Sequence, residues 1–301
     1  MNNLILLSDP HLTAKNFICR TDDVMQTQLE KFRFVRDYSN EHEALLLIAG
    51  DVCDRPRSWH LLADIIAEFD LFNIQPAVVF GQHDTYLYSE ETRNATTLGI
   101  LCKGSKVSAL SSEPLQYPNG LAIYGCHYGQ SVPTPKDPED FNVLVIHKEI
   151  ADAPLYPGQN FLDAEQFLKE HEAYEIVLCG DQHTTFVHEV KGRMIVNTGP
   201  LLRKTVGLWE HKPGFFHANL ETGSWKWIDI PCKPPEEVMT REHLAKVEEA
   251  SEMMEAFVSS IQQTEQKSVN FVAALQTFIQ ANNVPQPVVD ILAEVMEKAD
   301  A

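Results

Sequence analysis

Residues 74–84, Ile-Gln-Pro-Ala-Val-Val-Phe-Gly-Gln-His-Asp, carry the clearest combined signal of fold and chemistry in the chain. The apolar run at 74–79 is typical of a short buried strand, and Gly81 predicts a turn where that strand ends. Gln82, His83 and Asp84 follow the turn. An amide oxygen can bind a metal, a histidine can carry a proton, and an aspartate can hold that histidine in one tautomer.

Apolar runs and amphipathic segments alternate on both sides of this stretch. Two further apolar runs precede it, at 4–7 and 44–49, and the segments between them show helical spacing of apolar residues. This βαβαβ order predicts an α/β fold with a mainly parallel sheet buried on both faces. Later in the chain we expect strands at 121–125, 142–146 and 175–179, a helix at 162–171, and hairpins at 185–197 and 215–230.

A proline-rich segment at residues 231–235 reads as a linker. Beyond it the chain is rich in Glu, Ala, Met and Gln and shows only helical spacing. We therefore predict an α/β domain at residues 1–231 and a helical extension at 232–301. The apolar stripes of the extension suit either packing on the first domain or binding a partner.

Charge and cysteine content narrow the class of protein. The formal net charge of -19 argues against a protein that binds nucleic acid through an overall positive electrostatic field. It does not exclude a nuclease, because metals or a partner subunit can supply the positive charge. The six cysteines form no Cys-x-x-Cys pair, so we expect reduced thiols in the core. Neither a signal peptide nor a membrane span is evident, which predicts a soluble cytoplasmic protein that does not contact membranes.

Metal-binding residue types follow five of the predicted strands. They are Asp9 and His11, Asp51, Gln82 with His83 and Asp84, His147, and Asp181 with His183. Loops that follow parallel strands share one edge of the sheet, so these side chains can converge. Carboxylate, imidazole and amide ligands suit divalent ions such as Mn²⁺, and a pair of such ions is a standard device for cleaving phosphoesters.

The order of these motifs resembles that of the calcineurin-like metallophosphoesterases, over residues 1 to about 231. The shared motifs are Asp9-Pro10-His11, Gly50-Asp51, Gly81-Gln82-His83-Asp84, His147 and Gly180-Asp181-Gln182-His183. The resemblance implies a layered sandwich of mixed sheets flanked by helices. Residues 50–56, 197–203 and 212–216 are further similar to SbcD-type DNA nuclease subunits of bacteria and phages.

The resemblance also implies roles for individual residues. One metal would bind Asp9, His11, Asp51 and His183, and a second would share Asp51 and take Gln82, His147 and Asp181. His83 would donate a proton to the leaving oxygen or stabilise the transition state, with Asp84 orienting its ring. Gln82 and Asp181 stand where the family has asparagine and histidine. We expect Mn²⁺ at both positions, with Mg²⁺, Fe²⁺ or Zn²⁺ also compatible.

The implied function is metal-dependent phosphodiester hydrolysis by an SbcD-like exonuclease or endonuclease acting on DNA in repair or recombination. Its expected partners are an SbcC-like coiled-coil ATPase and a second copy of the chain, in a bacterial cell or phage-infected host. One alternative is a stand-alone phosphodiesterase or phosphatase acting on a small nucleotide or a phosphoprotein. Another is a non-catalytic scaffold. Outside the motifs, Asp54 is expected to help a turn or cap a helix. Arg55, Arg57, Arg203 and Lys204 could contact phosphates, but isolated basic residues near turns are usually only solvated.

Overall fold

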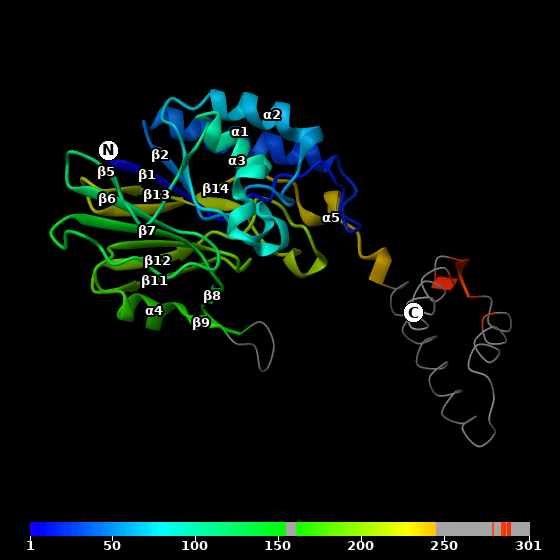
Figure 1. The fold of residues 1–301 in the computed structure, drawn as a ribbon. Helices are drawn as coiled ribbons and strands as arrows, with labels where there is room; N and C mark the ends of the chain where they lie inside the picture. The colour runs from blue at the N-terminus through cyan, green and yellow to red at the C-terminus, as the bar shows by residue number, and fades with distance from the viewer. Residues whose placement is uncertain (155–160, 245–278, 280–283, 287, 290–301) are drawn as a thin grey trace, which may run out of the picture. The chain divides into compact units, whose positions relative to one another are not determined.

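The computed structural model describes residues 1–154, 161–244, 279, 284–286, 288 and 289 (Figure 1). Contacts divide the chain into two units, Met1–Thr240 and Arg241–Ala301. The first unit therefore includes residues 232–240, which the sequence analysis placed in the extension. Most of the predicted helical extension lies outside the described residues. Within the described part of the chain, no helix combines the length and apolar character needed to cross a bilayer.

One six-stranded sheet has the order β14-β13-β1-β2-β3-β4. Its strands are β1 (Asn3–Leu7), β2 (Leu45–Ile48), β3 (Ala77–Val78), β4 (Ser108–Ala109), β13 (Gly214–Asn219) and β14 (Ser224–Asp229). β1 to β4 are parallel, and β13 and β14 add an antiparallel hairpin beside β1. The loops that follow β1, β2 and β3 therefore lie at one edge of this sheet.

The second six-stranded sheet has the order β11-β12-β10-β7-β6-β5. Its strands are β5 (Leu115–Gln116), β6 (Leu121–Cys126), β7 (Phe141–His147), β10 (Ile176–Gly180), β11 (Phe186–Val190) and β12 (Arg193–Asn197). The four central strands are parallel, and the two edge strands are antiparallel to their neighbours. β8 (Ile150–Ala151) and β9 (Leu162–Asp163) form a separate small pair.

The two sheets pack face to face with helices on their outer faces (Figure 1). Side chains alternate along β1, so Leu4 and Leu6 join the core between the sheets while Ile5 and Leu7 pack under the helices. Three helices share the latter core: α1 (Val24–Glu41), α2 (Trp59–Asp70) and α3 (Thr97–Lys103). The outer face of the second sheet is covered by α4 (Ala164–Glu170).

Side-chain caps set where several of these helices begin. The Asp23 carboxylate accepts the Gln26 N–H at the start of α1, and Thr96 accepts the Gly99 N–H at the start of α3. Asp163 caps α4 in the same way, so this helix begins at residue 164, two residues later than predicted. Short 3₁₀ turns make up much of the chain after β3: η1 (Gln82–Asp84), η2 (Tyr86–Tyr88) and η3 (Glu90–Ala95), with η4 (Val206–Leu208) further on.

The α/β class, the mixed sheets with flanking helices and both antiparallel hairpins are confirmed. The parallel sheet expected from the first βαβαβ strands is present as β1 to β4, and the layered sandwich implied by the resemblance is completed by the second six-stranded sheet. The predicted strand at 74–79 is reduced to a two-residue ladder in β3. The predicted linker at 231–235 is not wholly irregular: α5 (Pro235–Val238) begins at its last residue, and buried Val238 and Met239 pack with Cys19.

Candidate metal centre

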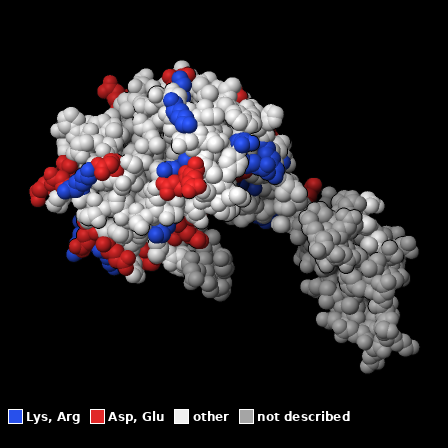
Figure 2. Space-filling view, in the orientation of Figure 1, with Lys and Arg blue, Asp and Glu red and all other residues white. Residues whose placement is uncertain are grey.

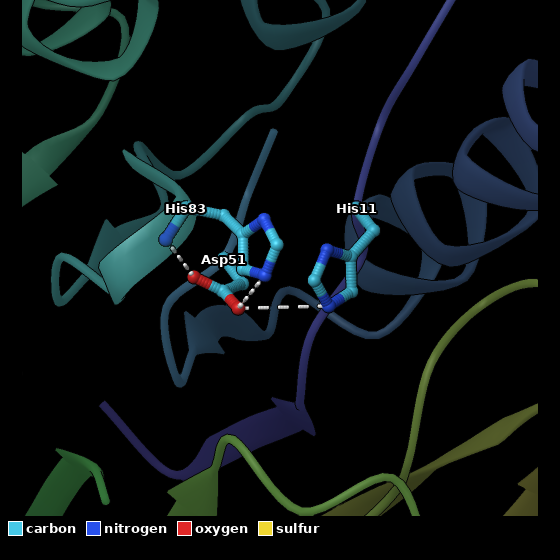
Figure 3. Close-up of side chains that lie close together, drawn as sticks. All are labelled: His11, Asp51 and His83. Carbon is cyan, nitrogen blue, oxygen red and sulfur yellow. Dashed lines mark hydrogen bonds and ion pairs between the residues drawn. The ribbon is translucent and has the colours of Figure 1, made fainter. Parts of the chain in front are cut away.

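Loops from both sheets bring the predicted ligands together at one end of the sandwich. Asp51, after β2, is the central residue. Its Oδ2 lies 3.6 Å from His11 Nε2, 3.6 Å from His147 Nε2 and 4.0 Å from His83 Nε2. Figure 3 shows the imidazoles of His11 and His83 both turned toward this carboxylate. Residues from distant parts of the sequence thus surround a single carboxylate oxygen.

The backbone around the ligands is strained. Asp9, His11, Asp51 and Asp181 all have positive φ, at 48°, 48°, 47° and 87°. This region is costly for residues with a Cβ, and such strain persists mainly where surrounding contacts enforce it, often at functional sites. Close approach also requires the glycine at 81, because a Cβ there would lie 2.1 Å from Asp51 Oδ1. The loops are therefore shaped to bring carboxylates close to backbone.

His11 and His183 form one pair of nitrogen donors. Their Nε2 atoms are 3.1 Å apart, which is about the separation of two nitrogens that each lie roughly 2.0–2.1 Å from one ion. Burial lowers the pKa of His11, and burial together with His11 and Lys204 lowers the pKa of His183 to about 3. Both rings are therefore neutral at physiological pH, which is the form that binds metal.

His147, Gln82 and Asp181 form a second group of donors. His147 Nδ1 lies 2.6 Å from the Ala49 carbonyl oxygen, and its Nε2 contacts the amide oxygen of Gln82. The Gln82 amide nitrogen donates to Asp181. The longer side chain of glutamine therefore directs its oxygen to the same place as the His147 nitrogen, and it also reaches the aspartate that replaces the family's histidine.

Charge in this second group favours a cation. Burial by itself would lower the pKa of His147, but Asp51, Asp9 and Asp181 together raise it to about 9. Burial opposes ionisation of Asp51 as well, yet His147, His11 and His83 around it lower the pKa of its carboxyl. The carboxylates thus concentrate negative charge at a point lined by metal-ligating atoms.

Two compact sets of ligand atoms share Asp51. In each set, His11–Asp51–His83 and Asp9–Asp51–His147, the ligand atoms lie within 4.8 Å of one another. Asp9 belongs to the second set: its Oδ1 is 3.7 Å from His147 Nδ1, and its carboxylate accepts the Asp181 N–H. Because hard oxygens and neutral imidazoles meet around one shared carboxylate, the residues fit a pair of divalent ions.

The structure changes the role of Asp84. The resemblance implied that its carboxylate orients the His83 ring, but Asp84 instead accepts backbone N–H groups from Val52, Cys53 and Gly81. Burial and the nearby Asp51 raise the pKa of Asp84 to about 7, against the effect of the backbone donors. Asp84 therefore ties the loop after β2 to the loop after β3 and supports the site without facing it.

Asp54 takes the orienting role, which the sequence analysis did not assign to it. Its carbonyl oxygen lies 3.0 Å from His83 Nδ1, so the opposite nitrogen of that ring faces Asp51. Its carboxylate lies 3.4 Å from both His11 Nδ1 and the ammonium of Lys204. His11, the nearby Lys204 and their hydrogen bonds outweigh the burial of Asp54 and lower the pKa of its carboxyl. Asp54 thus links both histidines of the first set, and Lys204 is a largely buried partner of Asp54, not a solvated residue.

Aromatic residues line the rim on the side of His147. The rings of Tyr128 and His147 have centroids 6.3 Å apart, and Tyr88 lies 6.1 Å from Tyr128. Tyr88 is 68% exposed. The neighbouring His127 is structural, because its Nδ1 accepts the Phe80 N–H at 2.9 Å and burial lowers its pKa to about 3.

Comparison with known proteins identifies the family of this chain. A family model described as calcineurin-like phosphoesterase matches residues 3–185, whereas no curated protein sequence matches the chain. Similar solved structures include an archaeal phosphodiesterase, at 14% identity over 75% of this chain and 99% of that chain, with a TM-score of 0.42. A 5′-nucleotidase precursor from Thermus thermophilus shares 13% identity over 84% of this chain and 59% of that chain, with a TM-score of 0.42. Vacuolar protein sorting 29 from Cryptosporidium parvum shares 14% identity over 76% of this chain and 96% of that chain, with a TM-score of 0.36. Since the family model spans more than half of the chain and includes all five ligand motifs, this protein belongs to the calcineurin-like phosphoesterase family.

Proposed function

We propose that this protein is a metal-dependent DNA nuclease that hydrolyses phosphodiester bonds at the centre around Asp51. The observation that carries the proposal is the placement of this carboxylate between two sets of ligands, with His83 at its exposed side. His83 has 43% of its side chain exposed, while His11, Asp51 and His147 are almost fully buried. The buried groups suit a fixed metal centre, and the exposed imidazole can reach a substrate.

Two divalent ions, which we propose to be Mn²⁺, would supply an activated hydroxide and neutralise phosphate charge. Asp51 would be shared between them. His11 and His183 would hold one, and His147, Gln82 and Asp181 the other, with Asp9 in the same set as His147.

His83 is the residue that we propose to supply a proton to the leaving oxygen. The Asp54 carbonyl accepts the Nδ1–H of His83 and so directs His83 Nε2 toward the substrate side of Asp51. In its doubly protonated form, His83 would donate the Nε2 proton to the oxygen that leaves phosphorus. The imidazole would retain the Nδ1–H and its hydrogen bond to Asp54.

DNA is the proposed substrate because residues 50–56, 197–203 and 212–216 resemble SbcD-type nuclease subunits. An SbcC-like coiled-coil ATPase is the corresponding proposed partner, to be contacted by the extension, and a second copy of the chain is another. The net charge of -19 supports a second candidate, a stand-alone phosphodiesterase acting on small substrates.

The test uses the full chain with Mn²⁺ on two substrates, labelled linear DNA and bis-p-nitrophenyl phosphate. A nuclease degrades the DNA, and both Asp51→Asn and His83→Ala abolish that reaction. Cleavage of only the small diester, even with a candidate ATPase subunit present, refutes the nuclease assignment and favours the second candidate. Absence of both bound metal and hydrolysis leaves a scaffold.

A further inference from the structure

A basic hollow of about 390 Å³ is lined by the chain segments that follow His11 and Asp54. It is lined by Lys15, Arg55, Arg57, Ser58 and Trp59, among others, and none of the described residues that line it is acidic. Figure 2 shows basic side chains gathered on this side of the first unit, where the N-terminal loop of Figure 1 runs. The hollow contrasts with a chain that has 43 acidic and 24 basic residues.

The cations of this hollow lack the acidic partners found elsewhere on the surface. Lys136 and Lys169, for example, each pair with a glutamate. Lys15 and Arg55 are exposed and form no ion pair within the described part of the chain, while the Arg57 guanidinium lies 4.8 Å from the centre of the Tyr86 ring. Unneutralised cations gathered in a hollow favour an anionic ligand, and several of them favour a ligand with repeated charges.

An exposed aromatic side chain accompanies these cations. Trp59 is the first residue of α2 and is 58% exposed, which is unusual for a tryptophan. A groove that combines positive charge with an accessible aromatic face is the usual means of binding single-stranded nucleic acid, because bases stack on the ring while cations contact the backbone. An acidic peptide would satisfy the cations but would leave Trp59 without a flat partner.

Two short chain segments connect the residues that line the hollow to ligands of the metal centre. Leu12 and Cys53 form a parallel β-bridge, which holds the segment after His11 against the segment after Asp51. Lys15 is four residues from His11, and Arg55 directly follows Asp54. At about 3.3–3.6 Å per extended residue, these cations lie within roughly 15 Å of the ligands along the chain.

We propose that the hollow binds the single-stranded DNA that flanks the scissile phosphate. Lys15, Arg55 and Arg57 contact phosphates, and Trp59 stacks on a base. This inference rests on the proposed function, since the strand held here continues into the metal centre. It explains how a strongly acidic protein can hold a polyanion: a local, acid-free surface replaces an overall positive field.

The experiment measures binding separately from cleavage. Fluorescence anisotropy of a labelled oligothymidylate is recorded with the full chain in EDTA over a range of salt concentrations. The variant Lys15→Gln/Arg55→Gln/Arg57→Gln is compared with Lys136→Gln/Lys169→Gln/Lys191→Gln, which removes the same charge at exposed positions elsewhere. Circular dichroism and melting curves check that both variants fold.

We expect the hollow variant to lower the slope of log K against log salt by about 2, because each phosphate that a cation neutralises on a single strand adds about 0.7 to that slope. The matched control should leave the slope within error of wild type. Trp59→Ala should weaken binding by at least about fivefold, in line with the removal of one stacked base. Cleavage of bis-p-nitrophenyl phosphate by the wild type reports the proposed function independently of this binding.

Equal weakening by both triple variants would show that only net charge matters and would overturn the proposal. Binding of polyglutamate as tight as that of the oligonucleotide would assign the hollow to an acidic protein instead. Tighter binding of duplex than of single strand, with no effect of Trp59→Ala, would overturn the single-strand assignment. If the hollow variant alone loses DNA binding but the wild type cleaves no diester, the binding site stands and the proposed function fails.

Discussion

Replacement of His83 by alanine tests the proton-donor assignment directly. The His83 ring is 43% exposed, and its polar contacts are with the Asp54 carbonyl and Asp51. Removing it leaves no buried cavity and deletes one partly exposed hydrogen bond, so the free energy of unfolding should fall by no more than about 1 kcal/mol. Loss of general acid catalysis should instead slow the chemical step by about 10²–10⁴-fold, which is roughly 3–5 kcal/mol in activation free energy.

The size of this loss should depend on the leaving group. Cleavage of DNA expels an alkoxide, which needs a proton, whereas bis-p-nitrophenyl phosphate expels a stabilised phenolate. His83→Ala should therefore reduce kcat by about 10²–10⁴-fold on DNA and by less than about tenfold on the small diester. Both rates are measured in saturating Mn²⁺, with His188→Ala as a matched control on the β11 hairpin, where this histidine pairs with Asp152.

Two results would refute this reasoning. An equal loss on both substrates would mean that His83 stabilises charge on phosphorus and does not protonate the leaving oxygen. Loss of a bound metal ion from His83→Ala, measured by elemental analysis, would show that it is a ligand, as its place in a set with His11 and Asp51 would also allow. If His83→Ala retains both metal ions and slows cleavage of DNA more than cleavage of the small diester, His83 acts as the proton donor.

Three further predictions concern the support of the metal centre. Gln82→Leu keeps the size of the side chain but removes the amide that contacts His147 and Asp181, so calorimetry should show at least about tenfold weaker binding of one ion and little change in the other. Asp84→Asn places an NH₂ group against backbone N–H donors and should lower the free energy of unfolding, measured in urea, by about 1–3 kcal/mol. The control Asp64→Asn should leave this free energy nearly unchanged. Equal stability of the two variants would contradict the proposal that Asp84 holds the loops after β2 and β3 together. The pKa of His147 is raised to about 9, so this residue is protonated at pH 7 and must lose about one proton to bind a metal. Binding of Mn²⁺ should therefore release that proton at pH 7 and progressively less as the pH rises past 9. Calorimetry in buffers of different ionisation enthalpy measures the number of protons released, and a release that does not vary with pH would refute this prediction.

Much of the metal centre could be predicted because its ligands occupy local positions. Asp51 lies shortly after β2 and His147 is the last residue of β7, and parallel strands open at a common edge whatever else surrounds them. The type of each strand and the position of the loop after it were therefore sufficient to predict that the ligand side chains meet at one edge of the sheets. The division into two sheets was harder to predict, since apolar strands of similar length do not reveal which neighbours they pair with.

The sequence also misassigned the support of His83. Asp84 adjoins His83 in the chain, and adjacency favoured it as the orienting group. The structure turns its carboxylate toward backbone N–H groups and brings the carbonyl of Asp54 to the ring instead. A backbone carbonyl carries no residue-type signal, so only the folded path of the chain could identify it.

The residue types and their order along the chain determined the family, the α/β class and the set of groups able to bind metal. Tertiary structure decided how those groups combine: Gln82 with His147 and Asp181, and Asp54 with Lys204, 150 residues away. It also created the basic hollow, because Lys15 and Arg55 become neighbours only through the bridge between Leu12 and Cys53. Metal-ligand types can be recognised one strand at a time, whereas electrostatic partners and surfaces depend on distances between segments that local sequence does not encode.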